Sequence, residues 1–345
     1  MFARKHPDTE SIHFGWREAV AYARTALFFL TRKRPKLSLT ALSRMSAMDV
    51  RTLPPIRRFT ASDGETLAYR TYHGPEERQI VMIHGSACFG DQLHKLARHI
   101  AEESAATVHT IDMRGHGHNA RGSAPAESYA RDVGEFCAHL KQHPARPQVI
   151  LAGHSAGGGL VLNAAYGPYV RNIDGMLLLA PYLGIASGSL RPYFGGWLVG
   201  IAWLKLAATA ALNLIGVTRF NDRPLVAFDR EACLHDPRFV REWSFDTLLG
   251  FGPGMTRPAS AEMLDFRIPM LLISGDRDEC FRPDRYKSVM DRIAPWASIQ
   301  LFPGLGHWDI LADNGVATFC VNWLERQFAI EQRVQRGKTK DAKIA

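Results

Sequence analysis

The sequence predicts one large α/β domain, in which a mostly parallel sheet carries helices on both faces and an apolar cap is inserted near the middle. Short apolar runs alternate with helix-length amphipathic segments over residues 56–182 and again over 266–330. Between these parts, residues 183–265 are rich in apolar side chains but give no strand signal. With 345 residues, 46% hydrophobic and 22% charged, the chain is long enough to bury a full core.

The expected strands are short apolar runs bounded by turn residues. They lie at 56–61, 66–72, 79–83, 107–113, 149–152, 173–180, 270–274 and 299–302. The first two flank Asp63-Gly64 and predict a hairpin. Helices are expected at 93–103, 129–142, 160–166, 285–293 and 316–328. This alternation predicts crossover connections and therefore parallel strand pairing.

The insertion at 183–265 holds the most apolar stretch of the chain. Residues 193–217 contain Trp197, Trp203 and many aliphatic residues against a single charge, Lys205. Such a length could span a membrane. The strands before and after it belong to one sheet, however, so a single crossing would put them on opposite sides of a bilayer. We therefore expect a helical cap over the site, with Trp197 and Trp203 binding substrate.

The positive charge of the chain lies at its two ends. Residues 1–60 hold twelve Lys or Arg against four Asp or Glu, and residues 326–345 hold six against two. The total of +8 therefore leaves 61–325 with a net charge of −4. We divide the ends into an N-terminal extension, 1–55, and a basic C-terminal tail, 331–345. Such ends suit solvated tails or a membrane surface.

The extension contains one predicted amphipathic helix, at 11–30. One face of it carries Ile12, Trp16, Ala19, Val20, Ala23, Leu27 and Leu30, and the other carries Arg17, Glu18, Arg24 and Thr25. A basic run, 32–36, follows. Charges within the segment exclude a membrane span. Two interpretations stay open: an interfacial helix in peripheral contact with a membrane, or a helix packed on the domain.

The remaining composition predicts a reducing compartment and no metal. The five cysteines are scattered without a C-x-x-C pair, and the start of the chain does not resemble a signal peptide, so a cytoplasmic protein is expected. No nucleic-acid fold signature is present, and no cofactor is expected. His116 and His118 resemble metal ligands but lack acidic partners nearby, and we interpret His116 as structural.

The stretch 149–159 carries the main chemical signal. It is an apolar strand that ends in Gly153-His154-Ser155-Ala156-Gly157, which is the pattern G-x-S-x-G between a strand and a helix. A Cβ at either glycine would collide with the neighbouring strand or helix, and the sharp turn strains the serine. The serine hydroxyl is thereby presented beside a helix N-terminus, whose free N–H groups can hold an oxyanion.

Polar residues follow other strands of the predicted sheet. Asp276 and Asp278 follow 270–274, and His307 follows 299–302, so the chain order Ser, Asp, His suits a catalytic triad at the carboxyl edge of the sheet. His307 is the candidate base for Ser155. We favour Asp278 over Asp276 because two further residues let the chain turn toward the histidine.

Two backbone N–H groups are expected to form the oxyanion hole. One belongs to Ala156, directly after the nucleophile, and the other to Ser86, which follows His84-Gly85 after the strand 79–83. We also expect His84 and Gly85 to contact the substrate.

The chain resembles the α/β-hydrolase superfamily and is similar to its monoacylglycerol lipase and lysophospholipase branch, also described as serine aminopeptidase S33-like. The resemblance covers about residues 56–330. It rests on these motifs: His84-Gly85, Asp112-Met113-Arg114-Gly115-His116-Gly117, Gly153 to Gly158, Gly275-Asp276-Arg277-Asp278 and Gly306-His307. It implies a mostly parallel eight-stranded sheet, a cap between the strands that flank 183–265, and Asp278 as the triad acid. Residues 1–55 lie outside the pattern.

These residues predict a serine hydrolase that cleaves carboxylic esters through an acyl-enzyme. The apolar cap favours a monoacylglycerol or lysolipid, and thus a role in lipid metabolism, over a small polar ester. A lactonase, thioesterase or peptidase could use the same triad. An alternative of another class is a pseudoenzyme that acts as a membrane-associated binding module, against which the intact triad argues.

Overall fold

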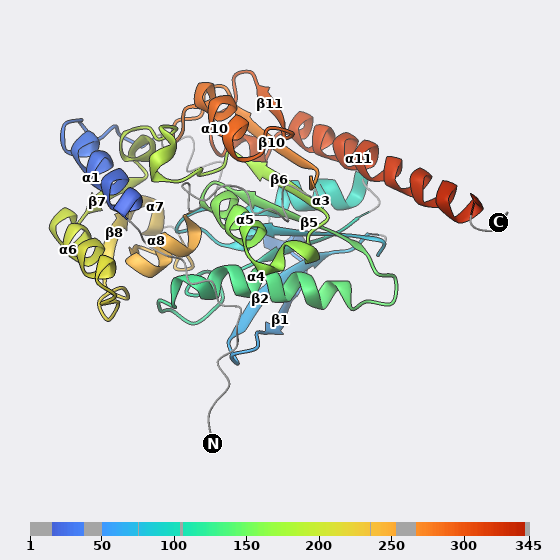
Figure 1. Cartoon of the computed structure of the whole chain (residues 1–345), viewed down its shortest axis with the longest axis horizontal. Helices are drawn as coiled ribbons and strands as arrows, with labels where there is room; N and C mark the ends of the chain where they lie inside the picture. Colours follow the sequence, from blue (N-terminus) through green and yellow to red (C-terminus); the bar gives the residue numbers. More distant parts are fainter. Residues whose placement is uncertain are drawn as a thin grey trace.

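The computed structural model describes residues 16–37, 50–74, 76–103, 106–234, 236–252 and 267–341. Its centre is an eight-stranded sheet in the order β1-β2-β4-β3-β5-β6-β10-β11 (Figure 1). The strands are β1 (Ile56–Thr60), β2 (Thr66–Tyr72), β3 (Arg78–Ile83), β4 (Thr107–Ile111), β5 (Gln148–His154), β6 (Gly175–Leu179), β10 (Met270–Gly275) and β11 (Ser298–Phe302). Each lies where the sequence predicts a strand.

The sheet is parallel from β4 to β11 and antiparallel only where β2 joins β1 and β4. Alternate residues of the central strands face two separate cores. In β3, Val81 and Ile83 pack on one side, while Ile80 and Met82 pack on the other. Burial on both faces explains why these strands read as continuous apolar runs instead of alternating patterns.

Helices cover both faces, as expected. One core is closed by α3 (His94–Glu103) and α11 (Asn314–Asp341), and the other by α4 (Ala126–Lys141), α5 (Ala156–Tyr166) and α10 (Tyr286–Ile293). The last helix extends well past the expected end at 328. It includes most of the segment predicted as a tail from 331 and projects from the body of the protein (Figure 1).

The insertion after β6 is not purely helical, and the prediction that it lacks strands was wrong. It contains a three-stranded antiparallel sheet in the order β7-β8-β9. Its elements are β7 (Leu198–Ile201), α6 (Trp203–Leu214), β8 (Pro224–Phe228), α7 (Arg230–Leu234), β9 (Glu242–Ser244) and α8 (Phe245–Phe251). A continuous apolar run cannot distinguish a short buried strand from a helix, so β7 and α6 gave one undivided signal.

The first helix, α1 (Trp16–Leu30), packs on this cap. The Phe29 ring stacks on Tyr193 with centroids 5.1 Å apart, and the Tyr193 hydroxyl donates to the Phe29 carbonyl oxygen at 3.0 Å. Arg34, just after the helix, pairs with Asp229 at 2.9 Å. Within the extension, α1 and the residues that follow it to Arg34 therefore form a structural part of the cap. Of the residues assigned to the predicted apolar face, Ile12 lies outside the described residues.

The buried face of α1 is not the predicted one. Tyr22, Thr25 and Phe29 are buried, although Thr25 was assigned to the polar side, whereas Trp16 and Leu27 are exposed. The cap is lined with aromatic rings that pack against Tyr22 and Phe29, and this packing decides the orientation of the helix.

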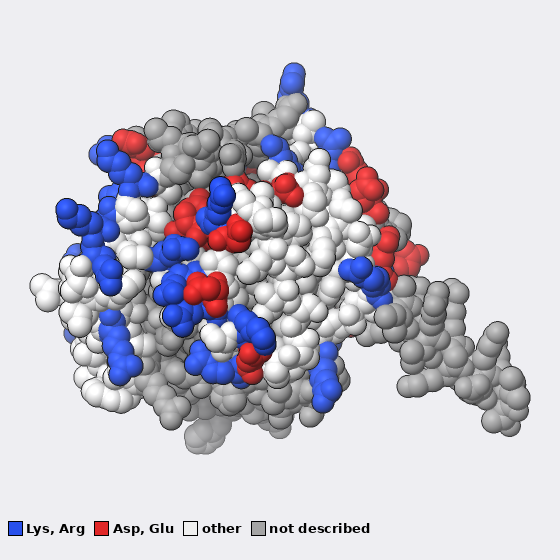
Figure 2. Space-filling model, turned by 90° about the horizontal axis from the view of Figure 1, so that it is seen from above, with Lys and Arg blue, Asp and Glu red and all other residues white. Residues whose placement is uncertain are grey.

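Most Lys and Arg side chains visible from above lie toward the end of the molecule that holds the cap (Figure 2). No helix in the described ranges is both long and apolar enough to cross a bilayer.

Candidate active site

The turn between β5 and α5 holds Ser155 in a strained conformation. Its backbone has φ 56° and ψ −120°, a left-handed φ that costs a residue with a side chain on the order of 1–3 kcal/mol. A Cβ on Gly153 would lie 2.3 Å from the Gly157 carbonyl oxygen, and a Cβ on Gly157 would lie 2.5 Å from the Ile83 carbonyl oxygen. The two glycines therefore let β5, α5 and β3 converge beneath the serine.

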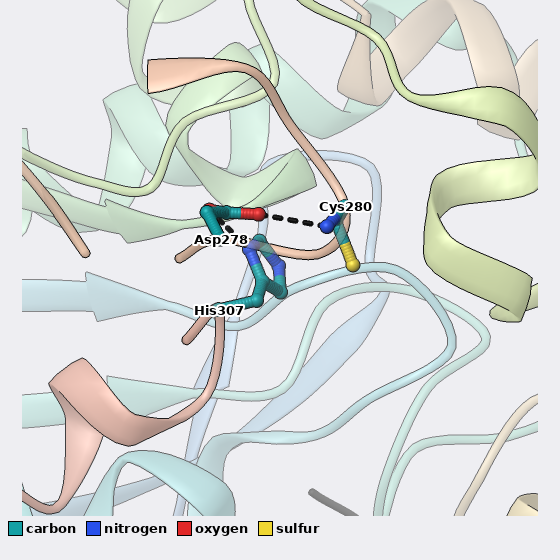
Figure 3. A group of neighbouring side chains, drawn as sticks. All are labelled: Asp278, Cys280 and His307. Carbon is teal, nitrogen blue, oxygen red and sulfur yellow. Dashed lines mark hydrogen bonds and ion pairs between the residues drawn. The ribbon is translucent and has the colours of Figure 1, made fainter. Parts of the chain in front are cut away.

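The histidine and one of the two candidate aspartates form a buried pair. His307 Nδ1 lies 2.9 Å from Asp278 Oδ2, and both side chains are almost inaccessible to solvent (Figure 3). Asp276 is exposed and accepts a hydrogen bond from the Gly304 backbone N–H at 2.7 Å, so it stabilises the turn after β11. Asp278, and not Asp276, is therefore the aspartate that contacts the imidazole.

Asp278 is held firmly by its own loop. Its Oδ1 accepts hydrogen bonds from the backbone N–H groups of Cys280 at 2.8 Å and Phe281 at 2.7 Å, which leaves Oδ2 for the imidazole. The His307 backbone N–H donates to Glu279 at 2.7 Å. Both ends of the Asp278–His307 pair are therefore fixed by residues 279–281. The Nδ1–H of His307 is directed at the carboxylate, so Nε2 is the ring nitrogen that can take up a proton.

His307 lies against the turn between β5 and α5 that carries Ser155, which we call the elbow. The rings of His154 and His307 have centroids 4.7 Å apart, and His154 Nε2 lies 3.1 Å from the His307 carbonyl oxygen. Burial first, and the proximity of His307 second, lower the pKa of His154 well below its usual value. His154, the residue directly before Ser155, therefore stays neutral and connects the loop that carries His307 to the turn that carries Ser155.

Asp278, Cys280 and His307 also place three potential metal ligands within 4.8 Å of one another (Figure 3). The carboxylate and the imidazole are already committed to each other. Burial and the neighbouring Asp278 raise the pKa of the Cys280 thiol, which donates to the Phe194 carbonyl oxygen at 3.3 Å. A protonated thiol is a poor metal ligand. This donor set suits an acid–base pair better than a metal site.

His84 does not contact the cavity, which corrects the expectation that it binds substrate. It is fully buried, its Nε2 accepts from the Met113 backbone N–H at 3.1 Å, and its Nδ1–H donates to the Gly85 carbonyl oxygen at 2.8 Å. Gly85 is not part of the cavity wall either. It packs against the turn that carries Ser155, where an added Cβ would lie 3.0 Å from the Ser155 Cβ. Both residues position the loop that carries Ser86.

A cavity with about 720 Å³ of space between its lining atoms, partly open to solvent, lies between this loop and the cap. Ser86, Ser155 and Ala156 all line it, so both expected oxyanion-hole residues share the cavity wall with Ser155. Trp197 and Trp203 line it, as the sequence argument expected. Among the described residues, no charged side chain lines this cavity.

The cap is hydrogen-bonded to the loop after β3. The indole Nε1–H of Trp197 donates to the Ser86 hydroxyl at 3.1 Å, and the Trp197 ring packs on Trp308, next to His307, with centroids 5.7 Å apart. Because the Ser86 oxygen accepts this bond, its own O–H is directed elsewhere. Trp197 therefore couples the cap to the loop that presents Ser86.

The loop after β4 is structural. His116 accepts a hydrogen bond from the Trp243 indole at 2.9 Å on Nε2 and donates from Nδ1 to the Arg114 carbonyl oxygen at 2.7 Å. Burial lowers the pKa of His116 to about 3, so it stays neutral. Arg114 bonds Asp132 through two nitrogens, at 2.5 and 2.6 Å. The interpretation of His116 as structural agrees with these contacts.

Part of the cavity wall was not predicted. Tyr22, Thr25 and Phe29 of α1 line it, as does Cys280. The spacing of Tyr22, Thr25 and Phe29, at i, i+3 and i+7, is a helical stripe and could have identified this face. The sequence pattern did not single out this stripe, because the same helix carries a second apolar stripe that includes Trp16, Leu27 and Leu30.

A family model described as serine aminopeptidase, S33, matches residues 74–314. The chain belongs to this family. It is therefore an α/β hydrolase, and the eight-stranded sheet, the elbow and the inserted cap are the family fold.

Solved structures support the same fold. A soluble variant of monoglyceride lipase from Saccharomyces cerevisiae matches with a TM-score of 0.62 and 18% identity, covering 81% of this chain and 97% of that chain. A monoacylglycerol lipase from Paleococcus ferrophilus matches with a TM-score of 0.53 and 20% identity, covering 75% and 98%. At this level of identity the likeness shows the fold alone.

One curated relative also aligns over most of the chain. The magnesium-chelatase 30 kDa subunit of Rhodobacter capsulatus is 23% identical over 274 residues, which cover 73% of this chain and 89% of that protein.

Replacing Asp278 with Asn should lower kcat for ester hydrolysis by roughly four orders of magnitude, because the amide no longer holds the imidazole tautomer with its bare nitrogen toward the serine. The Asn oxygen can still accept from Cys280 and Phe281, so the thermal midpoint should change little. Asp276→Asn, on the exposed turn, is the matched control and should keep kcat within a factor of about two. Equal losses in both variants would contradict the assignment.

Trp197→Phe should lower kcat/KM by roughly threefold to tenfold, since it removes one hydrogen bond to Ser86 while keeping an aromatic ring. In a Ser86→Ala background the same substitution should have almost no further effect, because the partner is gone. Trp296→Phe is the control: that indole donates to the Ile268 carbonyl oxygen, away from the cavity. Additive losses for Trp197 and Ser86 would show that the bond is not coupled to catalysis.

Proposed function

We propose that this protein is a serine hydrolase of carboxylic esters, with Ser155 as nucleophile, His307 as general base and Asp278 as the carboxylate that orients it. The observation that carries the proposal is the buried Asp278–His307 pair, which packs on His154 directly before a strained serine at the wall of an apolar cavity. Membership of an α/β-hydrolase family supports a hydrolase, and the geometry supports this particular chemistry.

In the acylation step, a lone pair of the Ser155 oxygen forms a bond to the ester carbonyl carbon while the carbonyl π electrons move to its oxygen. The serine proton passes to His307 Nε2, and Asp278 stabilises the resulting imidazolium. When the tetrahedral intermediate collapses, the bond to the leaving alcohol breaks and His307 returns the proton to that alcohol. Water repeats the sequence on the acyl-enzyme and releases the acid.

The negative oxygen of the intermediate is stabilised by the backbone N–H groups of Ser86 and Ala156. Ala156 is the first residue of α5, so the partial positive charge of a helix N-terminus adds to its N–H. Loss of one such donor typically costs roughly 3–4 kcal/mol of transition-state stabilisation.

The substrate class follows from the cavity wall. An aminopeptidase substrate brings a protonated amine, and burying that charge without a partner in an apolar site is costly. The described lining offers aromatic and aliphatic side chains instead, which suit an uncharged acyl chain. We therefore propose a monoacylglycerol-like ester, or a lysolipid whose phosphate stays outside the cavity.

The test is a chain-length profile of kcat/KM on p-nitrophenyl esters, run beside an aminoacyl amide, a lactone and a thioester. The rate should rise from acetate to medium or long chains, because each further buried methylene adds about 0.8 kcal/mol of binding. Leu206→Trp, which reduces the cavity on the α6 side, should weaken long chains selectively, and Ser155→Ala should abolish all turnover. A maximum at acetate, or faster cleavage of the amide, would refute the substrate class.

A further inference from the structure

The outer surface of the cap carries apolar side chains without a partner in the described structure. Leu204 is 89% exposed, Ile215 75%, Trp16 73%, Leu27 64% and Leu30 62%. They belong to α1 and to α6 with the residue that follows it, and these two helices pack side by side at one end of the molecule (Figure 1). We call these five residues the cap-end surface. Isolated exposed apolar residues are common, but a group of large ones on adjoining helices marks a site of interaction.

The chain around this surface is basic. Residues 16–36 and 198–223, which include these five residues, hold nine Lys or Arg against two Asp or Glu. Arg34 is engaged with Asp229, whereas Lys33, Lys36 and Lys205 are exposed. A large apolar surface bordered by mainly positive charge is the pattern of an interfacial helix that inserts between lipid head groups.

The same two helices form the cavity wall with their inner faces. Phe29 of α1 and Trp203 and Leu206 of α6 line the cavity, while Leu27, Leu30 and Leu204 of the same helices point outward. Only the thickness of one helix layer therefore separates the cap-end surface from the cavity.

We propose that the cap-end surface docks on a lipid bilayer that carries anionic head groups. A second copy of this chain is the main competing occupant. A symmetric dimer through this surface would place the basic residues of the two copies against each other, which costs energy unless acidic residues intervene. An anionic bilayer meets both features at once, because the leucines and Trp16 enter the acyl region while the lysines remain at the head groups.

Docking of this kind places the cavity directly above the lipid. If the proposed function holds, on which this consequence rests, a monoacylglycerol would have only a short path from the bilayer to Ser155. The N-terminal extension then has two roles, since its helix forms one wall of the cavity and contributes to the membrane contact.

Binding is measured by co-sedimentation of the full chain with vesicles of phosphatidylcholine alone and of phosphatidylcholine mixed with phosphatidylglycerol. The Ser155→Ala variant is used throughout, so that the result does not depend on hydrolysis. Binding should be stronger to the anionic vesicles and should weaken with salt. Leu27→Gln/Leu30→Gln/Leu204→Gln should lower the partition coefficient by at least about tenfold. Ile56→Gln/Leu301→Gln, exposed on the edge strands β1 and β11, is the control and should bind normally.

The charge contribution is tested in the same way. Lys33→Gln/Lys36→Gln/Lys205→Gln should weaken binding to anionic vesicles only, by at least about tenfold, whereas the exposed set Lys95→Gln/Lys287→Gln/Arg292→Gln should not. None of these residues lines the cavity, so turnover of a soluble ester by the same variants in a Ser155 background should be unchanged.

Three results would overturn the proposal: no binding to either vesicle, loss of binding in a control set equal to that in its test set, or a dimer in light scattering that the leucine variant dissociates. Failure of ester hydrolysis with binding intact would instead count against the proposed function alone.

Discussion

The close approach of three backbone segments beneath Ser155 is the constraint on which the rest of the structure depends. Gly153 and Gly157 have no room for a Cβ, so β5, α5 and β3 can converge and hold the serine at a left-handed φ. That conformation presents the hydroxyl at the cavity wall and the N-terminus of α5 beside it. The sheet then brings the Asp278–His307 pair to the same edge, and the cap covers the space above.

Histidines in this site differ in their partners, and the partner decides what each can do. His84, His116 and His154 are buried against backbone groups or an indole, and burial lowers the pKa of each, so they remain neutral and serve as structural connectors. His307 alone of these four faces a carboxylate. Of these four imidazoles, only His307 therefore has the carboxylate partner that the proposed proton transfer requires.

Every strand of the main sheet and the contact between Asp278 and His307 could be predicted, because strand ends and glycine-flanked turns are local signals. The cap could not, since its strands are short and lie within an apolar run. The buried face of α1 was also missed: the helix has two apolar stripes, and only the aromatic wall of the cap selects the one that contains Phe29. His84 was misassigned because a sequence does not show on which side of a loop a ring lies.

The most direct test of the central claim is covalent labelling by a fluorophosphonate, located by mass spectrometry of the digested protein. We expect one adduct, on the peptide that contains Ser155, and we expect it to form far more slowly in His307→Ala because the serine then lacks its base. No adduct in the folded wild-type protein, or an adduct on another residue that persists in Ser155→Ala, would contradict the account.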